Sequence, residues 1–97
     1  MERDVLISVS EFCRHHEIEV TFVQSLQENK LIELMVVRDE TFVHPDQLPR
    51  LEKMVRLYYD LDINLEGIEV INQLLERIEN MQQEIGVLKN KLSLFDE

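Results

Sequence analysis

The sequence predicts a mainly α-helical protein, with a winged helix-turn-helix head at residues 1–63 and a long coiled-coil helix at residues 64–97. Two short helical patterns separated by a tight turn predict the helix-turn-helix. Two β-prone runs after them predict a small hairpin, the wing. A heptad pattern of apolar residues then predicts the coiled coil. Ninety-seven residues are the size of one small domain.

The first helix is predicted to begin beside Ser8, after a short apolar run, Leu6-Ile7, that suggests a small strand. Ser8 and Glu11 have the spacing of a capping box, in which each side chain bonds the other residue's backbone N–H. The apolar period places one face of this helix against the core. That face consists of Val9, Phe12, Cys13 and His16.

The second helix is predicted to begin at Glu19 and to run to about Asn29. Ile18 and Val23 flank this start with the spacing of a hydrophobic staple. The residues expected to face inward are Phe22, Val23 and Leu26.

The wing is predicted from two apolar runs, Ile32 to Val37 and Thr41 to Val43, on either side of the polar segment Arg38-Asp39-Glu40. The turn lacks the Asn-Gly or Asp-Gly pair that two-residue hairpins favour.

A third helix is predicted to start with Asp46 as its N-cap, which places Pro49 in the first turn, where a missing N–H costs little. It should run to about Leu61 and end in the break Asp62-Ile63-Asn64, and Asn64 is a good N-cap for the next helix. Its inward residues are expected to be Leu51, Met54, Val55, Tyr58 and Leu61.

The last helix carries the heptad stripe, whose spacing alternates between three and four residues. Its positions are Ile71, Leu74, Ile78, Met81, Ile85, Leu88, Leu92 and Phe95. A helix of this length spans about 45 Å, more than the head can cover, so the part beyond about Ile78 needs a partner helix. These eight residues therefore predict a homodimer interface, and the alternative is that the helix folds back onto its own head.

The charges do not decide how the two helices would pair. Parallel pairing would set Glu84 against Lys89 and Lys91 against Asp96, whereas antiparallel pairing would set Arg77 near Glu84.

The charge of the chain disfavours nucleic acid as a partner. There are 20 acidic and 10 basic side chains, a formal net charge of -10, and phosphate contacts supply much of the affinity for DNA. The predicted second helix contains no basic residue, so we expect a basic protein surface as the partner.

An acidic stripe on the last helix is formed by Glu66, Glu69, Gln73 and Glu76, and Asp60 and Asp62 extend it. Its alternative role is that of an ordinary solvated helix face.

Other classes of function lack their motifs. A phosphate-binding glycine loop and a nucleophile with a plausible base are both missing, so we expect neither an enzyme nor a cofactor. Cys13 and His16 could hold one edge of a metal site, with His15 and His44 as the other candidates, but the set is too small for structural zinc, and we expect no metal.

The single cysteine, the lack of a membrane-spanning run and the N-terminal Met1-Glu2-Arg3-Asp4, which is unlike a signal peptide, predict a cytoplasmic protein with no membrane partner.

The order of these elements resembles the MerR superfamily of winged-helix proteins, and more closely its CbpM chaperone-modulator branch. The resemblance depends on Ser10-Glu11-Phe12-Cys13, Val55-Arg56-Leu57, the stretch from Leu61 through Gly67-Ile68, and the ending Leu92-Ser93-Leu94-Phe95. Glu17 stands where relatives commonly place Gly, and Leu31-Ile32-Glu33-Leu34 lacks a frequent Pro. The resemblance also favours antiparallel pairing of the coiled coil.

This resemblance implies that the chain binds the J-domain of a CbpA/DnaJ-type co-chaperone and blocks its stimulation of the DnaK chaperone. J-domains present a basic helix to DnaK, which an acidic competitor would complement. The residues expected to bind the J-domain are Asp60, Asp62, Glu66, Glu69 and Glu76. The alternative is a MerR-like transcription regulator that binds DNA as a dimer.

Overall fold

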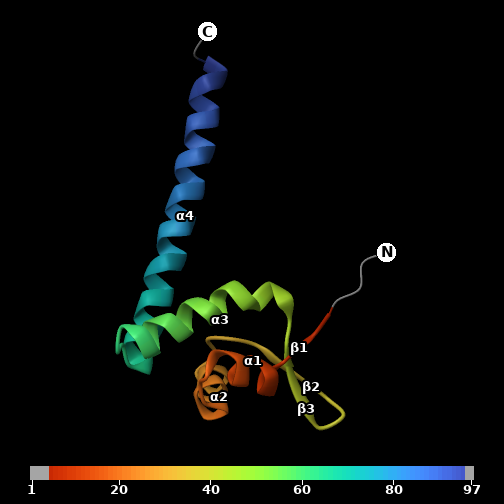
Figure 1. Ribbon diagram of the computed structural model, residues 1–97. Coiled ribbons are helices and arrows are strands. Elements are labelled where there is room, and N and C mark those ends of the chain that lie inside the picture. Colours follow the sequence, from red (N-terminus) through yellow and green to blue (C-terminus); the bar gives the residue numbers. More distant parts are fainter. Residues whose placement is uncertain (1–4, 96–97) are drawn as a thin grey trace. The chain divides into compact units, whose positions relative to one another are not determined.

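The computed structural model describes residues 5–95. The chain divides into two compact units between Leu65 and Glu66 (Figure 1). The first unit contains three short strands and the shorter helices, and the second is a single long helix. The elements follow in the order β1 (Ile7–Ser8), α1 (Val9–His16), α2 (Val20–Glu28), β2 (Leu34–Val37), β3 (Glu40–Val43), η1 (Pro45–Gln47), α3 (Leu48–Val55), η2 (Arg56–Asp60) and α4 (Leu65–Phe95). Residues Met1–Asp4 and Asp96, used above for the signal-peptide and pairing arguments, lie outside the described residues.

The N-terminus of α1 is capped as predicted, because Ser8 Oγ accepts the backbone N–H of Glu11 at 3.3 Å. The same hydroxyl makes a second, longer-range bond. Ser8 Oγ donates to Glu40 Oε2, 3.1 Å away, and so connects the start of the first helix to the wing.

The turn between α1 and α2 depends on a left-handed residue. Glu17 has φ 57° and ψ 46°, and the N–H of Ile18 donates to the carbonyl of Cys13 at 2.9 Å. This conformation is the one expected where relatives carry Gly. A left-handed residue other than Gly costs about 1–2 kcal/mol, so the tight turn is formed against local strain.

The core of the first unit is built from the predicted apolar faces together with residues of the wing and α3. Its buried members include Val9, Phe12, Cys13, Phe22, Val23, Leu26, Leu31, Ile32, Val43, Leu51 and Met54. His16, the last member of the predicted face, is exposed at the edge of the core, and its ring lies against Phe12 with centroids 4.2 Å apart. An imidazole remains hydrated at this edge while its ring covers part of the phenyl group.

The wing is a hairpin of β2 and β3, and β1 pairs with the other side of β3, which gives the sheet order β1-β3-β2. The register runs from Leu34 opposite Val43 to Val37 opposite Glu40. Both turn residues have positive φ, 52° at Arg38 and 65° at Asp39, as a type I′ turn requires. Two predicted limits were wrong: β2 begins at Leu34 instead of Ile32, and Glu40 belongs to β3.

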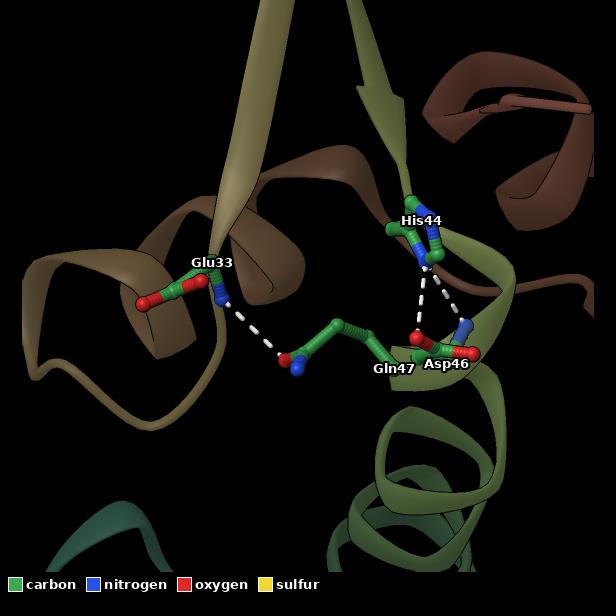
Figure 2. Close-up of polar contacts among 4 residues, drawn as sticks. All are labelled: Glu33, His44, Asp46 and Gln47. Carbon is green, nitrogen blue, oxygen red and sulfur yellow. Dashed lines mark hydrogen bonds and ion pairs between the residues drawn. The ribbon is translucent and has the colours of Figure 1, made fainter. Parts of the chain in front are cut away.

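His44 is the N-cap of η1, the short turn that leads into α3, and α3 itself follows Gln47, whose side chain makes no cap bond. The prediction of Asp46 as the N-cap was wrong. The backbone N–H of Asp46 donates to His44 Nδ1 at 3.1 Å (Figure 2). Pro45 is the first residue of η1. A histidine in this role has no common sequence signature, unlike Ser, Thr, Asp or Asn. Gln47 Oε1 accepts the N–H of Glu33 at 3.4 Å and links η1 to the segment before β2 (Figure 2).

The last turn of the third helix widens into a π-helical turn, η2. The N–H of Leu61 donates to the carbonyl of Arg56 at 3.2 Å, five residues back, and Asp62 (φ 59°) takes the left-handed conformation that ends the helix. Aspartate tolerates that conformation better than most residues. The inward positions predicted for Leu61 and Tyr58 were wrong, because these side chains are 62% and 36% exposed.

The second unit is α4, a continuous helix of 31 residues that begins directly after Asn64 (Figure 1). Ile68 and Asn72 are buried, one turn apart. Gly86 lies in open space, so it leaves no gap in a packed surface.

Candidate protein-interaction surfaces

The five carboxylates expected to bind a J-domain are all exposed. Asp60 is the last residue of η2 and Asp62 forms the left-handed turn after it, so both belong to the first unit. Glu66, Glu69 and Glu76 belong to α4, where their spacing places them with Gln73 along one side of the helix.

Such carboxylates act mainly over a distance. In water, two unit charges 4 Å apart interact by only about 1 kcal/mol, so a single surface pair contributes little affinity. The summed field of a chain with net charge -10 is stronger, and it attracts a basic partner before contact. The chemistry available here is electrostatic recognition of a cationic surface.

The heptad stripe of α4 is a second candidate surface, and it is apolar. Ile71 is half-buried, and the seven later members are exposed, from 48% at Ile78 to 85% at Phe95. The buried residues Ile68 and Asn72 lie outside this stripe. Heptad spacing with exposed apolar side chains is typical of a helix that pairs with another helix.

The α2 helix offers little to a nucleic acid. Its residues Val20–Glu28 include no lysine or arginine. Thr21, Gln24 and Glu28 are exposed, as is Glu19 before the helix. Thr and Gln can contact bases, but phosphate contacts position a DNA-binding helix.

The cysteine and histidine candidates do not converge. Cys13 is 2% exposed, and burial raises the pKa of its thiol. His15 and His16 are exposed and contact each other edge to face, while His44 Nδ1 lies 3.5 Å from a carboxylate oxygen of Asp46. Within residues 5–95, no group of three or more His, Cys, Asp or Glu side chains has a geometry suited to a metal ion.

One feature of the first unit was not predicted from the sequence. Tyr58 and Tyr59 both contact Phe22, with ring centroids 4.4 and 5.3 Å from it. The two adjacent tyrosines were a visible signal. Neighbouring residues of an α-helix do not normally face one target, so the cluster depends on the π-helical turn.

No helix in the described part of the chain combines the length and the apolar character that crossing a bilayer requires.

Two helices joined by a tight turn, followed by a hairpin wing, define a winged helix-turn-helix protein. The sequence pattern of the family described as "MerR HTH family regulatory protein" matches residues 7–90, and the chain belongs to that family. The predicted fold class is thereby confirmed.

Named relatives cover nearly the whole chain. It is 25% identical over 92 residues to the chaperone modulatory protein CbpM of Pseudomonas entomophila, across 94% of this chain and 91% of the relative. The CbpM proteins of Pseudomonas putida strain W619 and Escherichia coli O1:K1 are 24% and 27% identical over the same shares. The predicted resemblance to CbpM is confirmed, and no enzyme family is indicated. No solved structure matches the chain significantly.

Proposed function

We propose that this protein is a chaperone modulator that binds the J-domain of a CbpA/DnaJ-type co-chaperone and prevents it from stimulating DnaK. The observation that carries the proposal is the similarity to CbpM proteins over 94% of the chain. The excess of ten acidic side chains supports it independently, because it complements a basic helix.

The acidic residues have a defined part in this proposal. Asp60, Asp62, Glu66, Glu69 and Glu76 attract the basic helix of the J-domain and raise the association rate. Binding then covers the surface that DnaK would use. Inhibition therefore results from competition and needs no catalytic group.

The experiment is a calorimetric titration of the cognate J-domain into wild type and a charge variant. The variant changes Asp60, Glu66 and Glu69 to Lys and Asp62 to Asn, because Asn tolerates the positive φ of position 62. We expect affinity to fall at least about tenfold per truly interfacial reversal, since like charges then face each other.

The matched control changes Glu28, Glu33 and Glu52 to Lys and Glu79 to Gln, four exposed acids outside the stripe. It alters the net charge by the same amount, so a similar loss in both variants would show a general field effect. Full affinity in the stripe variant would place the contact elsewhere, and a wild type that binds no J-domain of its host would refute the function.

We also infer that the protein is a homodimer through the heptad stripe from Ile71 to Phe95. The support is the exposure of seven apolar side chains at heptad spacing. Pairing would remove these side chains from water, which is the main favourable term in coiled-coil association.

DNA-binding regulation is the second candidate, and the family description favours it. The lack of basic residues in α2 weighs against it. Salt dependence separates the two, because DNA binding weakens steeply as salt rises in proportion to the phosphates contacted.

A further inference from the structure

The end of the third helix presents an aromatic surface next to carboxylates, all within the first unit. The rings of Tyr58 and Tyr59 lie 5.0 Å apart at 74° to each other. Both rest on Phe22, which is 5% exposed, while the tyrosines are 36% and 39% exposed. Phe22 therefore serves as a buried support, and the tyrosine rings remain accessible to a partner.

A hydrogen bond fixes one of these rings. The hydroxyl of Tyr59 accepts the backbone N–H of Glu19 at 3.2 Å, which joins η2 to the start of α2. Tyr59 is thus fixed at its hydroxyl by this hydrogen bond and at its ring by the contact with Phe22. A ring held in this way loses less conformational freedom when it binds a ligand.

Two acidic residues, Glu19 and Asp60, adjoin Tyr59. The side chain of Glu19 accepts the hydroxyl of Thr21 at 3.2 Å, and its backbone is bonded to Tyr59. Asp60 follows Tyr59 directly and is exposed. Arg56, at the start of η2, opposes them with one positive charge.

Such an arrangement suits a cation. The face of an aromatic ring carries partial negative charge and attracts arginine or lysine, with arginine found more often because its planar group also stacks. Carboxylates beside the rings add charge-assisted hydrogen bonds. A π-helical turn is also frequent at functional sites, and here it brings both tyrosines onto the same support.

We propose that Tyr58 and Tyr59, with the carboxylates of Glu19 and Asp60, form a binding site for an arginine side chain of a basic helix in the partner protein. The inference rests on the proposed function for the identity of that partner. It extends that function, because it assigns recognition to an aromatic site in the first unit in addition to the acidic residues of α4.

The first experiment replaces Tyr58 and measures the affinity for the J-domain by calorimetry. Tyr58→Leu keeps apolar bulk over Phe22 but removes the ring, whereas Tyr58→Phe keeps the ring. We expect Tyr58→Leu to weaken binding roughly five- to thirtyfold and Tyr58→Phe to stay within about twofold of wild type. Equal affinity of Tyr58→Leu and wild type would overturn the site and leave the proposed function intact.

The second experiment does not require the J-domain. The chain has two tyrosines and no tryptophan, so its tyrosine fluorescence reports on this cluster alone. The probe is a helical peptide of alanine and arginine without aromatic residues, compared with the same peptide carrying glutamine in place of arginine. We expect only the arginine peptide to change the emission of the wild type.

A further variant keeps both rings and removes the charges. Glu19→Gln with Asp60→Asn should reduce the change in tyrosine emission caused by the arginine peptide severalfold. This variant still tests the site if Tyr58→Leu fails to fold. If the wild type shows the same emission with both peptides, or the charge-neutral variant responds as strongly as wild type, the site is refuted. If the J-domain does not bind but the arginine peptide does, the proposed function fails and the cation site stands.

Discussion

Self-association through α4 can be tested by placing an aspartate on one of two sides of the helix. Ile85 occupies the heptad stripe and Val87 lies two residues away, outside it, and each is 52% exposed. Replacing either with aspartate therefore adds the same charge at a site of the same exposure. Only Ile85→Asp places that charge in the predicted seam.

The magnitude follows from the exposed fractions. Full burial of an aliphatic side chain contributes about 2 kcal/mol, so covering the exposed half of Ile85 contributes about 1 kcal/mol. Each substitution occurs twice in a symmetric dimer, so Ile85→Asp removes about 2 kcal/mol, which is roughly a thirtyfold rise in the dissociation constant. Adding Leu88→Asp, at a position that is 58% exposed, doubles the loss to about 4 kcal/mol, or roughly a thousandfold. Desolvation of the new carboxylates increases both effects.

Sedimentation equilibrium over a range of concentrations measures the dissociation constants. We expect wild type and Val87→Asp to be dimers, and the Ile85→Asp, Leu88→Asp double variant to be monomeric. A wild type that is monomeric at tens of micromolar, on the order expected for a short coiled coil, would refute the reasoning. Equal weakening by Val87→Asp and Ile85→Asp would show that charge alone, not the seam, controls association.

The other predictions concern Glu17, duplex DNA and Cys13. Glu17→Gly should raise the free energy of unfolding by roughly 0.5 kcal/mol, because relief of left-handed strain exceeds the entropy cost of Gly, and urea denaturation that shows a loss would contradict it. Duplex DNA should give no shifted band even at low salt, where electrostatic binding is strongest, and a sequence-specific shift would reverse the ranking of the two candidate functions. Cys13 should react with an alkylating reagent much more slowly in the folded than in the urea-unfolded protein, because burial raises the pKa of its thiol. Because the pKa of the thiol is raised in the folded protein, its contribution to the free energy of unfolding is complete below the ordinary thiol pKa and is lost as pH rises above it. A free energy of unfolding that increased with rising alkaline pH would contradict the raised pKa of Cys13.

The parts of the fold that could be predicted are those governed by hydrophobic period and capping. Phe22, Val23 and Leu26 were identified as buried because three- and four-residue spacing marks one face of a helix. Ser8 was identified as an N-cap because its hydroxyl at that spacing satisfies a free N–H at a helix start. The left-handed turn at Glu17 was indicated instead by the resemblance, because relatives commonly place Gly at that position.

The errors have a common physical origin in local backbone geometry with weak sequence signals. His44 is an unusual N-cap, and the sequence favours the more typical Asp46. The π-helical turn at Arg56–Asp60 depends on one backbone bond shifted by a residue, and no residue type encodes such a shift. It turned Tyr58 and Leu61 toward the surface, and for that reason the aromatic cluster could not be predicted. The exposed acidic residues were accessible to sequence reasoning because charge and helical spacing are both readable there.

The central claim is that the chain competes with DnaK for a J-domain. The most direct measurement is the ATPase rate of DnaK stimulated by the cognate CbpA-type co-chaperone, followed as this protein is added. We expect the stimulated rate to fall to the basal rate of DnaK alone, and to recover when more co-chaperone is supplied. Stimulation that persists at saturating amounts of this protein would contradict the account.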